Sequence, residues 1–186
     1  MNVRWGDFEG FLENSYEPGI EKLFSWFTEN LRQGKFININ PFVQPLQSMI
    51  LNKPTNLRCG ADWNAISITT DGRYLCCPVA SSEEWNNVGT LDNDPKESLN
   101  LVVIGGPCDS CDIKKWCGGR CLYANHTMLW KEEGYKIVCG TVKHLIGLCQ
   151  GFVEELRQLI EKGVVKMEWF DQIGRASCRE RVFRAV

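Results

Sequence analysis

Four cysteines lie within fourteen positions in the stretch CDSCDIKKWCGGRC, residues 108–121. This stretch constrains the fold more than any other feature, because thiols this close together are bridged, bound to metal or kept reduced. The chain holds 10 cysteines in 186 residues, and residues 1–20 lack the basic and apolar regions of a signal peptide. We therefore expect a reducing, cytoplasmic location, where disulfide frameworks are uncommon. A loop stapled by disulfides is the weaker interpretation, and metal binding is the stronger one.

The composition predicts a folded chain without a nucleic-acid or membrane partner. Hydrophobic residues make up 44% of the sequence, which is enough for a packed core. The net charge is −2, so the chain offers no basic surface to nucleic acid or to an anionic membrane. The longest apolar runs are much too short to span a bilayer.

The C-x2-C spacing lets two thiolates bind one ion or one face of a cluster. A zinc ion takes four thiolates, and this stretch offers Cys108, Cys111, Cys117 and Cys121. Such a zinc site leaves three further cysteines without a role: Cys59, Cys77 and Cys139. Two [4Fe–4S] clusters use seven or eight thiolates, which matches the supply better. The spacing by itself does not decide between zinc and iron–sulfur.

Apolar periodicity predicts two helices and a short strand in the first part of the chain. Residues 18–35 carry one apolar stripe, formed by Ile20, Phe24, Phe27 and Leu31. Residues 36–42, FININPF, alternate and predict a strand that ends at Pro41. Residues 43–52 predict a short helix that closes before Pro54.

A final helix is predicted from about Cys139 to Lys162. Its apolar stripe consists of Leu145, Cys149, Phe152, Leu156 and Leu159. Cys149 belongs to this stripe, so we interpret it as a small buried thiol and not as a ligand.

The stretch WNAISITTDGRYLCCPVA, residues 63–80, predicts a β-hairpin. With Asp71-Gly72 as a two-residue turn, Ile68 faces Leu75 and Ile66 faces Cys77 across the strands. In that register Cys77 shares a face with the apolar residues, and Cys76 lies on the other face with Ser67 and Tyr74. The two adjacent cysteines are therefore predicted to differ in environment.

The order of the cysteines resembles a known seven-cysteine motif. Cys59 is followed after twelve residues by Gly72 and after four more by Cys77. Then come C-x2-C-x5-C-x3-C within residues 108–121 and, after a gap, Cys139. This pattern is similar to the SPASM motif, the C-terminal auxiliary iron–sulfur module of many radical SAM enzymes. The words LRCGADWNAISITTDGRYLCCP, CDSCDIKKWCGGRCLYAN and EEGYKIVCGTVKHLI resemble a branch of peptide-modifying radical SAM/SPASM proteins.

The resemblance implies two [4Fe–4S] clusters with interleaved ligands. The first auxiliary cluster would take Cys59, Cys77 and Cys121. The second would take Cys108, Cys111, Cys117 and Cys139. Some relatives complete the first cluster with a cysteine where this chain has Ala65. The fourth iron position is then open to substrate or taken by Cys76 or Asp62. We assign no catalytic residue.

The implied fold class is α+β: a SPASM domain with a β-hairpin, cysteine-rich loops and a C-terminal helix. We expect residues 1–55 to be the last αβ segment of a truncated (β/α) radical SAM barrel. Residues 56–140 would form the SPASM domain, and residues 141–172 the closing helix. The implied partners are the missing barrel and a peptide or protein substrate. The SAM-cleaving motif C-x3-C-x2-C occurs nowhere in the 186 residues. S-adenosylmethionine would therefore bind only to the full-length parent, and this chain alone should be inactive. The alternative function is a cytoplasmic zinc-binding module without catalysis.

The tail, residues 173–186, differs in character from the rest of the chain. Its first part, IGRASCRERV, has no apolar periodicity and is similar to the translation of a commonly used sequencing adapter. We therefore expect a non-native tail, in which Cys178 is accidental.

Overall fold

The computed structural model describes residues 8–171, which form two units. One unit combines the chain up to Lys53 with the chain from Gly140 onward, and the other is Pro54–Cys139. Helices and one small antiparallel sheet make up the chain, so the α+β class is as predicted. Between residues 8 and 171, no helix has both the length and the apolar character needed to cross a bilayer. The tail with Cys178 lies outside the described residues.

The first unit is helical. Its elements are α1 (Phe8–Phe11), the π-helical η1 (Leu12–Tyr16), α2 (Glu17–Arg32), α3 (Asn40–Ile50), α7 (Glu168–Asp171) and the part of α6 (Lys131–Glu161) that follows Cys139. The helix predicted for residues 18–35 is α2, and its stripe residues Phe24, Phe27 and Leu31 are buried. The predicted closing helix is the C-terminal part of α6, which begins eight residues earlier than expected.

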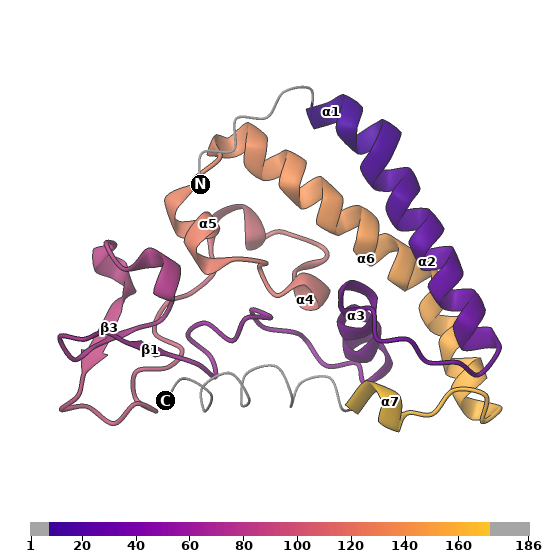
Figure 1. The fold of residues 1–186 in the computed structure, drawn as a ribbon. Coiled ribbons are helices and arrows are strands. Elements are labelled where there is room, and N and C mark those ends of the chain that lie inside the picture. Colours follow the sequence, from indigo (N-terminus) through magenta and orange to yellow (C-terminus); the bar gives the residue numbers. More distant parts are fainter. Residues whose placement is uncertain (1–7, 172–186) are drawn as a thin grey trace. The chain divides into compact units, whose positions relative to one another are not determined.

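Aromatic side chains form the core of this unit, where α2 and α6 converge toward their C-terminal ends (Figure 1). The ring of Phe24 meets Phe42 of α3 edge-on at 5.0 Å and Phe152 of α6 edge-on at 6.0 Å. Cys149 is fully buried beside Phe42, as its place on the apolar stripe predicts. On the surface, Arg32 of α2 binds Glu155 of α6 through two N–H···O contacts of 2.6 and 3.0 Å.

The strand predicted for residues 36–42 is not formed. Residues 35–39 are irregular, and Pro41 does not end a strand but occupies the first turn of α3, where its missing N–H is harmless. Phe36 stacks on Trp169 and meets Phe170 edge-on. Its partial burial against α7 accounts for the apolar character that the strand prediction relied on. The expected αβ barrel segment therefore has its helices but lacks its strand.

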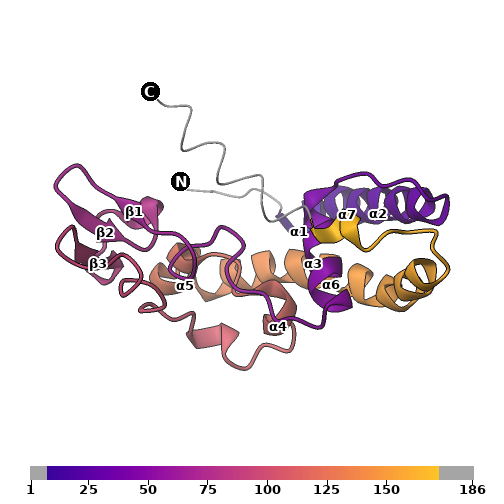
Figure 2. The same ribbon diagram turned by 90° about the horizontal axis from the view of Figure 1, so that it is seen from below.

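The sheet of the second unit has the order β1–β2–β3 (Figure 2). β1 is Ser67–Ile68, β2 is Arg73–Leu75 and β3 is Asn87–Thr90. The hairpin is confirmed, but Ile68 pairs with Tyr74 and Ser67 with Leu75, so the predicted register is wrong by one residue. The turn has three residues, closed by the bond from Thr69 N to Arg73 O at 3.0 Å, with Gly72 at φ 84°. In consequence Ile68 is exposed while Leu75 is buried.

Short helices and loops complete the second unit. They are the 3-10 turns η2 (Pro78–Ala80), η3 (Glu84–Asn86) and η4 (Gly106–Cys108), with the helices α4 (Lys114–Cys117) and α5 (Leu122–Thr127) and the start of α6. A compact core joins them, formed by Leu57, Ala61, Cys76, Cys77, Ala80, Ile104, Cys108, Leu122 and Tyr135. Three cysteines belong to this core, so thiols take part in the packing of the unit.

Candidate functional site

All seven predicted ligand cysteines lie in the Pro54–Cys139 unit, and electrostatic contact divides them into two groups. Thiol group 1 is Cys59, Cys77 and Cys121. Charge on Cys59 or Cys121 raises the pKa of Cys77. Thiol group 2 is Cys108, Cys111, Cys117 and Cys139, and charge on any of the first three raises the pKa of Cys139. Residues far apart in sequence thus come into electrostatic contact within each group.

Cys77 of thiol group 1 ends the hairpin and begins η2. Its side chain is buried, and burial raises the pKa of the Cys77 thiol. The nearby backbone N–H groups of Val79 and Ala80 act in the opposite direction, whereas charge at Cys121 and Cys59 raises the pKa further. Backbone dipoles thus offset part of the cost of a negative charge on this sulfur.

Asn86 holds the backbone around Cys77 in place. It is fully buried, its Oδ1 accepts the N–H of Cys77 at 2.8 Å, and its Nδ2 donates to the carbonyls of Cys77 and Ala80, both at 2.8 Å. Oδ1 also accepts the thiol of Cys76 at 3.0 Å. The Asn86 side chain therefore fixes the backbone of Cys77 and orients the thiol of Cys76.

The two side chains that the sequence left open as a fourth ligand are engaged elsewhere. Burial, helped by the charge of Asp62, raises the pKa of Cys76 to about 12, so this thiol stays protonated as a donor to Asn86. Asp62 accepts the N–H of Val102 at 2.6 Å and also that of Leu101. Burial raises the pKa of Asp62, whose Oδ1 has no hydrogen-bond partner among residues 8–171.

Thiol group 2 has cations beside it. Burial raises the pKa of Cys117, and the thiolates of Cys108 and Cys111 raise it as well, while Arg58 lowers it. Burial and the same kind of thiolate charge raise the pKa of Cys139, and Arg120 opposes them. The two guanidinium groups offset part of the negative charge that four thiolates would concentrate here.

Two glycines let the chain pass closely around Cys117. Gly118 ends α4 with φ 71°, and a Cβ there would lie 2.2 Å from the backbone oxygen of Asn56. Gly119 has φ 87°, and its Cβ would lie 2.7 Å from the side chain of Ile104. The backbone N–H of Gly119 lowers the pKa of Cys117 and so opposes the effect of burial. The close packing requires this Gly-Gly pair.

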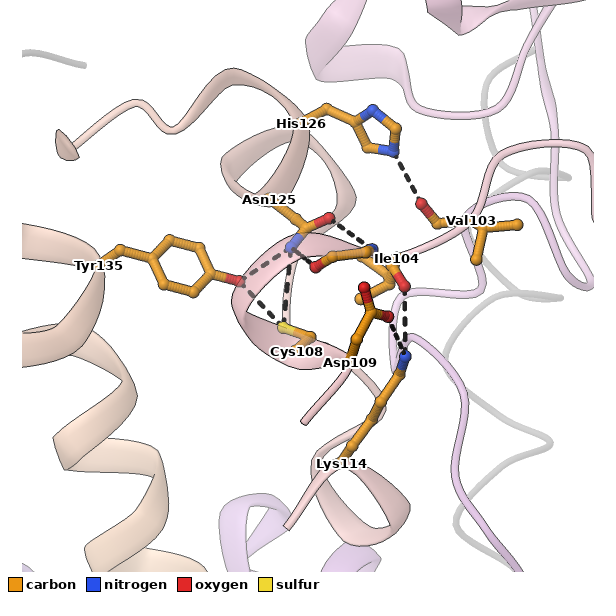
Figure 3. Close-up of polar contacts among 9 residues, drawn as sticks. Val103, Ile104, Cys108, Asp109, Lys114, Asn125, His126 and Tyr135 are labelled. Atoms are coloured by element: carbon orange, nitrogen blue, oxygen red, sulfur yellow. Dashed lines mark hydrogen bonds and ion pairs between the residues drawn. The ribbon is translucent and has the colours of Figure 1, made fainter. Parts of the chain in front are cut away.

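Cys108 of thiol group 2 belongs to a buried polar network (Figure 3). Its sulfur lies 3.2 Å from the hydroxyl of Tyr135 and 3.7 Å from Nδ2 of Asn125. Asn125 in turn binds both backbone groups of Gly105, accepting from N–H at 3.1 Å and donating to the carbonyl at 2.9 Å. Asn125 therefore holds the backbone of this turn at Gly105, and Tyr135 contacts the side chain of Cys108.

The thiols do not converge on one point. Among residues 8–171, no group of three or more histidine, cysteine, aspartate or glutamate side chains is arranged to hold a metal ion. The four thiolates of one zinc ion must lie close to each other, because each bonds to the same atom at about 2.3 Å. The four thiolates of a cubane cluster bond to four different irons and are held farther apart. Residues 8–171 thus present neither a formed zinc site nor a formed cluster site.

A separate pocket of about 240 Å³ lies in the same unit. Asp62, Trp63, Val102 and Lys114 are among its lining residues, and none of the seven ligand cysteines is. Lys114 is already bound to Asp109 at 3.2 Å and to a backbone carbonyl at 3.3 Å. The pocket thus lies apart from the thiols.

Comparison with protein-family models, with curated proteins and with solved structures gave no match. Three residues of the site were not predicted from the sequence: Asn86, Asn125 and Tyr135. Nothing in their local sequence distinguishes them from surface residues, since their partners lie 6 to 27 positions away.

Proposed function

We propose that this chain binds two [4Fe–4S] clusters, one on thiol group 1 and one on thiol group 2. The proposal is carried by the gathering of all seven cysteines in one unit, where Cys59 and Cys121 act on Cys77, and Cys108, Cys111 and Cys117 act on Cys139. These sets coincide with the two interleaved ligand sets that the SPASM resemblance implies.

The surroundings of the thiols support a bound anionic group. Nearby backbone N–H groups lower the pKa of Cys77 and Cys117, and the charges of Arg58 and Arg120 lower the pKa of Cys117 and Cys139. Hydrogen bonds to sulfur and nearby positive charge both stabilise iron–sulfur clusters in proteins. Bound clusters would supply one-electron chemistry, and the chain would hold, orient and insulate them.

In this proposal the chain is the auxiliary-cluster portion of a cytoplasmic radical SAM/SPASM protein. Peptide or protein modification follows from the resemblance alone. The clusters would transfer electrons or hold the substrate, and S-adenosylmethionine would bind to the barrel of the full-length parent. The residues of this chain hold the clusters and none acts on S-adenosylmethionine.

The proposal is tested by metal analysis of the anaerobically purified chain. Two clusters predict about eight irons and about eight acid-labile sulfides per chain. A colourless protein with stoichiometric zinc would instead establish the zinc module.

Two cysteine variants test the ligand assignment. Cys117→Ala should remove the cluster on thiol group 2, because a cubane needs its thiolate ligands and metal binding is coupled to folding. Cys149→Ala should leave the iron content unchanged, because Cys149 is buried among apolar side chains outside the Pro54–Cys139 unit. Equal loss of iron in both variants would show that the assignment is wrong.

A further inference from the structure

Tyr135, at the start of α6, contacts a predicted cluster ligand directly. Its hydroxyl lies 3.2 Å from the sulfur of Cys108 and 3.2 Å from Nδ2 of Asn125 (Figure 3). All three side chains are at least nine-tenths buried, with exposed fractions of 6%, 8% and 8%. Taken alone, the contact between Tyr135 and Cys108 allows either atom to be the donor.

The hydrogen bonds of Asn125 determine the direction. The N–H of Gly105 can only donate, so the amide atom 3.1 Å from it must be the oxygen of Asn125. The amide nitrogen of Asn125 then faces Tyr135, and this nitrogen can only donate. The two protons of this nitrogen have three acceptors in reach: the Gly105 carbonyl at 2.9 Å, the Tyr135 oxygen at 3.2 Å and the Cys108 sulfur at 3.7 Å. With the two shorter bonds made, the Tyr135 oxygen is an acceptor and its single proton is left for the sulfur of Cys108.

We propose that the Tyr135 hydroxyl, oriented by Asn125, donates a hydrogen bond to the Cys108 sulfur and thereby raises the reduction potential of the cluster on thiol group 2. An iron-bound thiolate carries no proton, so the hydroxyl is the donor whenever iron is bound. Reduction adds negative charge to the cluster and its sulfurs, and a donated hydrogen bond stabilises that charge. Tyr135 is thus a positioning residue that acts through Cys108. This inference rests on the proposed function.

The test compares two Tyr→Phe variants of the whole chain, loaded anaerobically with iron and sulfide. Tyr135→Phe removes the hydroxyl on Cys108. Tyr74→Phe is the matched control, because Tyr74 is equally buried and its hydroxyl bonds a backbone carbonyl, that of Asn93, at 3.4 Å. Iron and sulfide are measured first, and the reduction potentials are then determined by titration followed by electron paramagnetic resonance.

We expect Tyr135→Phe to keep its iron and to move one of the two cluster potentials to a more negative value, while Tyr74→Phe moves neither. Unchanged potentials in a fully loaded Tyr135→Phe protein would overturn the inference and leave the proposed function intact. A wild-type chain that takes up no iron would refute the proposed function itself, and the inference with it.

Loss of iron from Tyr135→Phe is resolved by a second variant. Replacement of Tyr135 by 3-fluorotyrosine keeps the hydroxyl and makes it a stronger donor. The same cluster potential should then move to a more positive value. A potential that stays unchanged or becomes more negative in this loaded protein would overturn the inference.

Discussion

Replacement of Asn86 tests whether its hydrogen bonds hold the backbone at Cys77 and Ala80 in place. Replacing it by alanine removes the partner of the Cys77 N–H, for which the structure gives no other acceptor among residues 8–171. An orphaned buried donor costs about 1–3 kcal/mol. The carbonyls of Cys77 and Ala80 each lose one bond but keep another, from Ala80 N at 3.2 Å and from Glu83 N at 2.9 Å.

Each of these two lost bonds costs about 0.5–1.5 kcal/mol. The free energy of unfolding should therefore fall by about 2–6 kcal/mol, a large part of the ~5–15 kcal/mol typical of a domain. Because Asn86 also positions Cys77, we expect the iron content of the loaded chain to fall from about eight to about four per chain.

The assay is urea unfolding of the loaded protein, combined with iron analysis. Asn87→Ala is the matched control: it is the next residue, it is exposed, and it should change the stability by less than about 0.5 kcal/mol. Equal stability of Asn86→Ala and Asn87→Ala would refute the reasoning. Reduced stability with all iron retained would show that Asn86 does not position Cys77 for ligation.

Two further predictions concern a close backbone approach and a surface ion pair. Gly118→Ala should destabilise the chain by more than about 2 kcal/mol in urea unfolding, since φ is 71° and the new Cβ would meet the oxygen of Asn56. Gly140→Ala, in helix α6 with open space around it, should be neutral or stabilising by up to about 1 kcal/mol. A Gly140→Ala protein that is less stable than Gly118→Ala would contradict this reasoning. Arg32 and Glu155 are 42% and 43% exposed, so a double-mutant cycle should give a coupling below about 1 kcal/mol despite the bidentate geometry. Arg32 lowers the pKa of Glu155, so this coupling should be present at neutral pH and disappear as the pH falls through that lowered pKa; a coupling that grows in acid would refute the assignment.

Local patterns predicted the helices and the hairpin, but not the details that depend on distant partners. The stripe of α2 and the burial of Cys149 follow from helical periodicity alone. The hairpin register was wrong because Asp71-Gly72 indicates a turn without giving its length, and the turn has three residues. The strand at residues 36–42 was wrong because Phe36 packs on the ring of Trp169, which no local pattern reveals.

The same distinction holds for the candidate site. The sequence named the seven cysteines from their order and spacing. It did not identify Asn86 or Tyr135, because a buried asparagine and an exposed one have the same local signature, as Asn86 and Asn87 illustrate. Cys76 and Asp62 remained open alternatives until the structure gave each of them protein partners.

The interleaving of the two thiol groups along the chain bears on how the protein is made. Thiol group 1 becomes complete when Cys121 leaves the ribosome, whereas thiol group 2 still lacks Cys139, which follows α5 and the first turns of α6. If the proposed clusters are inserted during synthesis, the order of the cysteines would set the order of assembly: the site on thiol group 2 could be completed only after α6 begins to emerge.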